Sequence, residues 1–102
     1  MILHCVYCDF RASVKEVEKR NILVRLAQFS ETLDGVVSFE FGPNKDFEQK
    51  SANYDWGFVI KFTDDKALEN YAEHPEHKAL GGELVALCEG GADGIVVFDL
   101  DV

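Results

Sequence analysis

Two runs of alternating side chains stand next to each other in the middle of the chain, Val36-Val-Ser-Phe-Glu-Phe41 and Tyr54-Asp-Trp-Gly-Phe-Val-Ile-Lys-Phe62. Alternation with a period of two predicts a strand with one apolar face. The apolar faces are expected to hold Val37, Phe39 and Phe41 in the first run, and Trp56, Phe58, Ile60 and Phe62 in the second. Gly42-Pro-Asn44 breaks the first strand, and the polar residues 43–53 predict the longest loop. The centre of the chain is therefore two consecutive strands without a helix between them.

Helical patterns flank these two strands. Ser13-Val-Lys-Glu16 has the form of a helix capping box, and Asp34-Gly35 supplies a stop, so a helix is predicted over about 14–33. Thr63-Asp64-Asp65 resembles the N-cap of a second helix. Pro75 should end or kink that helix before a further helical piece over about 76–89. The apolar face of the first helix is predicted from Val14, Val17, Val24, Leu26, Ala27 and Leu33.

Apolar runs at the two ends of the chain, residues 2–10 and 94–102, complete the pattern as two more strands. The order β-α-β-β-α-β predicts one α+β domain over residues 1–102, ferredoxin-like, with a four-stranded antiparallel sheet and its helices on one face. Because the end strands are apolar on both sides, the bare face of the sheet needs a second cover. The simplest cover is another copy of the chain, so we expect a homodimer that pairs sheet against sheet.

The charge balance excludes several partners. The formal net charge of −9, from 10 Lys and Arg against 19 Asp and Glu, repels phosphate backbones and anionic lipid. The basic residues Lys15, Lys19, Arg20 and Arg25 alternate with acidic ones, as on a solvated helix face. No stretch approaches the ~20 apolar residues that span a bilayer, and the N-terminus lacks the features of a signal peptide. We therefore expect a cytoplasmic protein with no nucleic-acid or membrane partner.

The three cysteines, Cys5, Cys8 and Cys88, are predicted to be reduced thiols. Cys5-Val-Tyr-Cys8 has the spacing of a CxxC motif, but residues three apart in a strand point to opposite faces. The two thiols then cannot share a metal or form a disulfide, and we expect them to pack as small hydrophobic side chains.

The segment Tyr71-Ala-Glu-His-Pro-Glu-His77 carries the residues best suited to chemistry. A histidine can give or take a proton near neutrality, and a tyrosine hydroxyl can stabilise a developing enolate. His77 and Tyr71 together suit proton abstraction beside a carbonyl, with His4 and His74 as further candidates. The alternatives are that these side chains serve the core and helix caps, or that His74 and His77 with Glu73 or Glu76 hold a metal.

The chain resembles the stress-responsive A/B barrel (Dabb) family over nearly its full length. The resemblance is carried by His4, Asp34-Gly35-Val36, Phe41-Gly42-Pro-Asn44, Asp64-Asp65-Lys66-Ala67-Leu68, Tyr71-x-x-His74-Pro75-x-His77 and Phe98-Asp99. It implies the dimeric α+β barrel fold, in which two ferredoxin-like subunits pair through their sheets.

One branch of that family contains olivetolic acid cyclase, which closes a ring by an aldol reaction without a cofactor. The resemblance implies that His77 and Tyr71 match its catalytic pair and that His4 lines the cavity. Trp56 stands where that enzyme has a strand histidine, and an apolar residue such as Leu26 stands where it has a helix tyrosine. The polyketide substrate is therefore not carried over, and His4, Trp56 and His74 are candidates for lining a differently shaped cavity.

Three functions remain open at this stage. The first is a homodimer that binds a small apolar or carbonyl-containing molecule in a cavity between sheet and helices. The second is a cofactor-free lyase or cyclase that uses the His77–Tyr71 pair, and the third is a structural stress protein without turnover. We expect no cofactor and no metal in any of them.

Overall fold

The computed structural model describes all 102 residues. The chain forms β1 (Ile2–Cys8), α1 (Glu16–Ser30), β2 (Val36–Pro43), β3 (Trp56–Phe62), α2 (Asp65–Glu73), α3 (Pro75–Leu87), a single 3-10 turn η1 (Gly91–Gly94) and β4 (Ile95–Asp101). The four strands make one sheet in the order β2-β3-β1-β4, and every neighbouring pair is antiparallel. The predicted ferredoxin-like α+β fold is confirmed.

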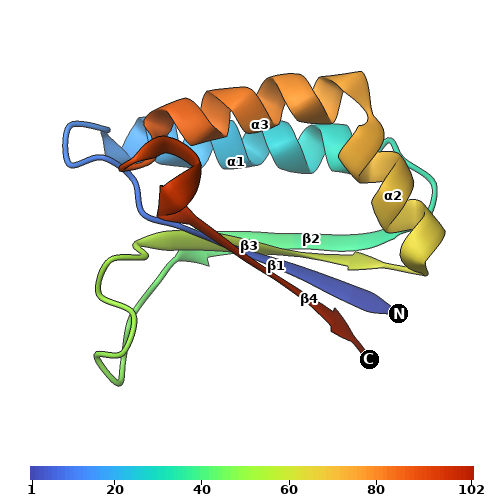
Figure 1. Ribbon diagram of the computed structural model, residues 1–102, viewed down its shortest axis with the longest axis horizontal. Coiled ribbons are helices and arrows are strands. Elements are labelled where there is room, and N and C mark those ends of the chain that lie inside the picture. Colours follow the sequence, from blue (N-terminus) through green and yellow to red (C-terminus); the bar gives the residue numbers. More distant parts are fainter.

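The helices form a single layer over one face of the sheet, as Figure 1 shows. Seventeen buried side chains make one hydrophobic cluster between the layers, with Leu23, Leu26, Ile60 and Phe62 almost wholly inaccessible. No helix covers the other face of the sheet, which we call the open face (Figure 1). None of the helices has the length and apolar content that crossing a bilayer requires.

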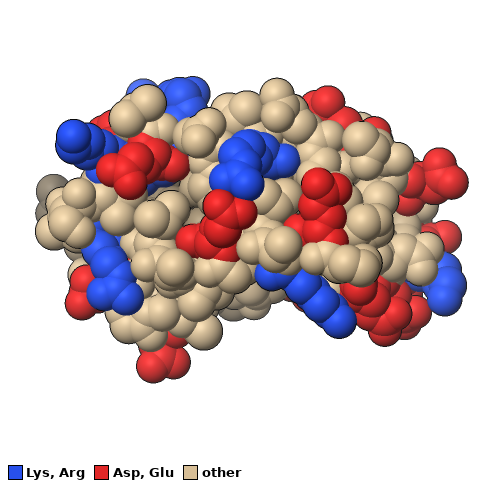
Figure 2. All heavy atoms as spheres, turned by 90° about the horizontal axis from the view of Figure 1, so that it is seen from above, with Lys and Arg blue, Asp and Glu red and all other residues tan.

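The outer surface of the helix layer is an ordinary solvated surface. Acidic and basic side chains are interspersed on it, as Figure 2 shows. Arg25 of α1 and Glu83 of α3 form a two-pronged ion pair there, with nitrogen–oxygen distances of 2.8 and 2.9 Å.

The first helix begins later than the capping box predicted. Its N-cap is Lys15, and the carboxylate that reaches back to the Lys15 N–H belongs to Glu18, at 3.3 Å. The Ser13–Glu16 box is therefore wrong by two residues. The predicted apolar face is also displaced: Val17 is 69% exposed, whereas the buried face runs through Lys19, Ile22, Leu23, Leu26, Phe29 and Ser30.

Lys19 is buried because two carboxylates meet it. Its Nζ lies 2.7 Å from Asp55 Oδ2 and 2.8 Å from Glu16 Oε1, so the expectation of a solvated lysine was wrong. Burial alone acts to lower the pKa of Lys19, but the hydrogen bonds to Asp55 and Glu16 outweigh it and hold the pKa above its usual value. The lysine therefore stays charged and ties α1 to the start of β3.

A β-bulge changes the face that β2 presents. Val36 pairs with Phe62 and Ser38 with Lys61, so Val37 is an extra residue in the edge strand. Val36 packs against the core in place of Val37, which is 52% exposed. The prediction for Phe39 and Phe41 holds, but the prediction for Val37 was wrong because the bulge shifts the alternation by one residue.

The break between α2 and α3 follows the predicted chemistry. Asp64 caps α2 by accepting from the Ala67 N–H at 2.9 Å. His74 ends α2 in an extended conformation and caps α3, with Pro75 at its first position. The two helices therefore meet at a fixed angle at His74, and the start of α3 folds back over the end of α2.

Candidate functional site

Three of the predicted residues meet at this helix junction. The His77 ring centroid lies 4.3 Å from that of Tyr71, and the His4 ring of β1 lies 5.8 Å from Tyr71 on the sheet side. Phe62 of β3 packs against Tyr71 from below, at 5.3 Å between centroids. We call His4, Tyr71 and His77 the imidazole cluster, because the tyrosine ring lies against both histidines.

His4 has a partner that the sequence did not indicate. Its Nδ1 lies 2.6 Å from Asp99 Oδ1, and the two residues are directly opposed in the pairing of β1 with β4. A carboxylate accepts hydrogen bonds, so Nδ1 is the donor to Asp99 and Nε2 points away from it. The His4–Asp99 pair could have been predicted from sequence only if the antiparallel register of the two terminal strands had been known.

His77 is oriented by the backbone. Its Nδ1 lies 3.1 Å from the carbonyl oxygen of Ala72, which can only accept, so Nδ1 is the donor. Burial lowers the pKa of His77, the bond to Ala72 opposes this, and nearby His4 and His74 lower the pKa further. The imidazole is therefore neutral at pH 7 and can take up a proton at Nε2.

Both free nitrogens reach accessible surface. No buried side-chain nitrogen or oxygen in the structure lacks a hydrogen-bond partner. The Nε2 atoms of His4 and His77 have no such partner, since each ring bonds only through Nδ1. Each Nε2 is therefore at least partly accessible to solvent.

Tyr71 is buried between the two imidazoles and α1. Its side chain is 1% exposed, and its hydroxyl lies near that of Ser30 of α1. The Ser30 hydroxyl in turn donates to the Leu26 carbonyl oxygen at 2.7 Å. Burial raises the pKa of Tyr71 far above its usual value, so the phenol stays protonated. In this arrangement the Tyr71 ring lies against the two imidazoles while its hydroxyl is near Ser30 of α1.

His74 and Trp56 do not join the imidazole cluster. His74 Nδ1 accepts from the Glu76 N–H at 3.1 Å, and its ring packs on Phe29 at 4.8 Å. Trp56 pairs with Cys8, whereas His4 pairs with Ile60, four residues or about 13 Å further along β3. The Trp56 Nε1–H donates to Glu16 Oε2 at 2.9 Å. The predicted cavity lining is therefore divided between two ends of the sheet.

The cysteines lie as the strand pattern predicted. Cys8 faces the helices and Cys5 the open face, and all three thiols are free and buried. Cys8 and Cys88 are hydrogen-bonded to each other, which together with burial raises the pKa of Cys8. No group of three or more His, Cys, Asp or Glu side chains is arranged to hold a metal ion.

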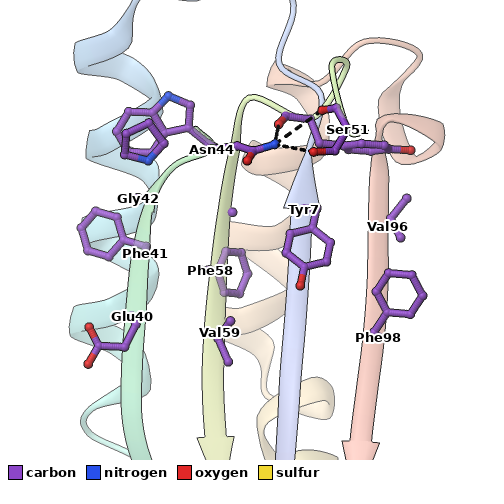
Figure 3. A pocket seen from close by; sticks show the side chains of 14 residues that line it. Tyr7, Glu40, Phe41, Gly42, Asn44, Ser51, Phe58, Val59, Val96 and Phe98 are labelled. Carbon is purple, nitrogen blue, oxygen red and sulfur yellow. Dashed lines mark hydrogen bonds between the residues drawn. The ribbon is translucent and has the colours of Figure 1, made fainter. Parts of the chain in front are cut away.

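The two main hollows lie outside the space between sheet and helices. One, of about 340 Å³, lies between α1 and α3 and is lined by Arg25, Phe29 and Leu80 among others. The larger, of about 590 Å³, is mostly apolar and lies on the open face. Figure 3 shows it between the β2–β3 loop and the neighbouring side chains of Tyr7, Val59 and Phe98. Neither hollow is lined by His4, Tyr71 or His77.

The chain was compared with known proteins. Residues 2–102 match the family model described as the Stress Responsive A/B Barrel Domain, Dabb. Comparison with curated proteins gave no match.

Solved structures show the same fold. A dimeric ferredoxin-like protein of unknown function from Jannaschia sp. CCS1 is 43% identical, with a TM-score of 0.89 over 99% of this chain and 98% of that one. A hydroxynitrile lyase from Passiflora edulis is 13% identical, with a TM-score of 0.84 over 99% of this chain and 92% of that one. A cofactor-independent oxygenase from Streptomyces nogalater is 14% identical, with a TM-score of 0.80 over 99% and 91%. The last two show the fold alone, whereas the family match spans the chain: this protein belongs to the stress-responsive A/B barrel (Dabb) family.

Proposed function

We propose that the protein is a homodimer in which each subunit binds a small carbonyl-containing molecule at the imidazole cluster. The observation that carries this is the pair of Nε2 atoms on His4 and His77. Neither atom has a hydrogen-bond partner within the fold, both are at least partly accessible to solvent, and the two rings flank that of Tyr71.

The chemistry of the cluster restricts the ligand. The accepting Nε2 of neutral His77 complements a hydrogen-bond donor, so the ligand fits best as an enol or a phenol, or as a carbonyl compound with an acidic neighbouring C–H. A neutral His77 can accept the proton at Nε2 as general base, while the Asp99 carboxylate keeps His4 oriented. If the bound molecule loses a proton to His77, the same site can carry out cofactor-free lyase or cyclase chemistry.

Exposed apolar side chains on the open face support the proposed dimer. Tyr7, Phe98 and Leu100 are 37%, 52% and 49% exposed there, and the rings of Tyr7 and Phe98 lie 6.0 Å apart. An apolar surface of this kind on adjacent strands is typical of an interface. The structurally similar protein with 43% identity is dimeric. A second copy that covers the open face does not cover the imidazole cluster, because the cluster lies on the helix side of the sheet.

A structural role is the second candidate, and one observation favours it. The Nδ1 atoms of all three histidines bond within the fold, to Asp99, to the Glu76 N–H and to the Ala72 carbonyl. In that case the imidazoles serve to hold β4, α2 and α3 in place.

Thermal unfolding with a panel of enolisable carbonyl compounds and phenols separates the two candidates. A ligand at about 100 times its Kd adds about 2.7 kcal/mol to the free energy of unfolding, a shift of about 10–20 °C in Tm for a chain of this size. We expect that shift in the wild type and its loss in His77→Gln. The matched control is His74→Asn, which removes an imidazole but keeps an N-cap side chain, and it should keep the full shift. If no compound stabilises the wild type, the structural role stands and the binding proposal fails.

A further inference from the structure

The loop between β2 and β3, residues 44–55, is held together by its own side chains. Asp46 Oδ1 accepts three hydrogen bonds at 2.9 Å, from the N–H of Lys50 and from the N–H and hydroxyl of Ser51. Asn44 Nδ2 donates to the Ser51 hydroxyl at 2.8 Å and to the Tyr54 carbonyl at 2.7 Å. Asn44 Oδ1 accepts from the Asp46 N–H at 2.8 Å. The loop is therefore pre-organised and does not need a partner to order it.

This framework holds one large apolar side chain away from the protein. Phe47 is 93% exposed, more than any other large hydrophobic residue in the chain. It lies between Asp46 and Gln49, the only residues other than glycine with positive φ, at 45° and 58°. Such backbone geometry costs free energy and persists where surrounding contacts impose it, as the bonds to Asp46 do here. A strained and ordered loop that exposes a phenylalanine has the properties of an interface anchor.

The position of the loop indicates the partner. Figure 1 shows it hanging below the sheet, on the side opposite the helices. The mostly apolar hollow of about 590 Å³ lies on the same side, with Tyr7, Val96 and Phe98 in its lining. Two sheets that pack face to face are about 10 Å apart, so a loop that leaves the sheet plane in this direction runs alongside the opposing sheet. The net charge of −9 makes an anionic membrane an unfavourable alternative.

We propose that Phe47 of each protomer packs onto the open face of a second copy and helps to fill that copy's apolar hollow. Twofold symmetry makes the contact reciprocal, so two phenylalanines are buried per dimer. Each open face is then complete only when the partner contributes its loop. This inference rests on the proposed homodimer and adds the residue that anchors it.

Sedimentation equilibrium of the full chain tests the anchor. We expect Phe47→Ser to raise the dissociation constant of the dimer tenfold or more, because two aromatic contacts are lost at once. Phe47→Leu should restore most of the affinity. The matched control is Val17→Ser, which also replaces an exposed apolar residue but on α1, behind the sheet, and should leave the constant unchanged. A dimer of unchanged affinity in Phe47→Ser overturns the anchor while the dimer itself stands, and a wild-type monomer at micromolar concentration overturns both.

Fluorescence gives a second readout that does not depend on affinity. In a Trp56→Phe background, Phe47→Trp places the only indole of the chain in the loop. Its emission should be blue-shifted in the dimer and move to the red on dilution into monomer. An emission maximum typical of water at concentrations where the chain is dimeric contradicts the proposal. Neither measurement involves the imidazole cluster, so a failed anchor is distinguishable from a failed ligand site.

Discussion

The Nδ1 atom of His4 and the Oδ1 atom of Asp99 lie 2.6 Å apart across the pairing of the first and last strands. Residues 95 positions apart in the chain thereby fix which nitrogen of one imidazole carries the proton. We expect Asp99→Ala to remove this control and populate the Nε2–H tautomer of His4. Asp99 is 45% exposed, so the accompanying loss of stability should stay below about 1 kcal/mol.

Two-bond ¹H–¹⁵N correlation spectra of the histidine rings check this prediction directly. Asp101→Ala is the matched control, because it removes the same charge two residues along β4, where no hydrogen bond to a histidine is present. An unchanged His4 tautomer in Asp99→Ala would mean that other contacts orient the ring.

The stability of the protein should fall on acidification through the range set by His77. Burial places its folded-state pKa below the value of about 6.5 expected in the unfolded chain. The unfolded state therefore binds more protons in this range, and stability present above pH 6.5 is lost as the pH falls through the lower folded-state pKa. Urea unfolding between pH 7.5 and 5.5 should show this slope in the wild type and a flatter one in His77→Gln. Equal slopes would contradict a lowered pKa.

Lys19→Met should destabilise the fold by about 1–3 kcal/mol, because Asp55 then loses its cationic partner where it is only partly solvated. The methionine keeps most of the apolar stem, so the loss reports the charge and its hydrogen bonds. Chemical unfolding measures it. Lys66→Met is the control, since Lys66 is 77% exposed and its pairing with Glu69 is 4.0 Å long. A Lys19→Met protein as stable as the Lys66→Met protein would show that the buried ion pair contributes nothing.

Two glycine substitutions should act in opposite directions. Gly35 has a φ of +83°, and an added Cβ would lie 2.5 Å from Ala67 Cβ, so Gly35→Ala should cost about 1–3 kcal/mol. Gly82 lies in α3 with no atom within 4 Å of an added Cβ, so Gly82→Ala should add up to about 1 kcal/mol. Denaturant midpoints compared at a constant m-value give both changes. The argument from local space and backbone angle fails if both variants move the same way.

Features written in local sequence were predictable. The period of two over residues 54–62, the Asp64 cap and the break at Pro75 all depend on neighbours within a few positions, and each appears in the structure. The ring of Tyr71 beside His77 follows from the same helix break.

Features that depend on distant partners were not predictable from those patterns. Lys19 is buried only because Asp55, 36 residues away, meets it, and Asp99 reaches His4 only through the strand register. Val37 lies outside the core because one extra residue in β2 shifts the alternation, and nothing in the local pattern indicates where a bulge forms. Trp56 fits a strand face, yet its distance from His4 depends on which residues pair across β1 and β3.

The bulge at Val37 also affects whether further chains can add to the edge of the sheet. Strands β2 and β4 are the two borders of the sheet, where unpaired peptide groups invite another chain to add a strand. The irregular stretch of β2, its terminal Pro43, and the carboxylates of Asp99 and Asp101 on β4 all disfavour such addition. Lateral polymerisation into ribbons is therefore blocked within the plane of the sheet. In the proposed dimer, contact across the sheet closes after two molecules, which would keep a chain with so much apolar strand surface from fibrous aggregation.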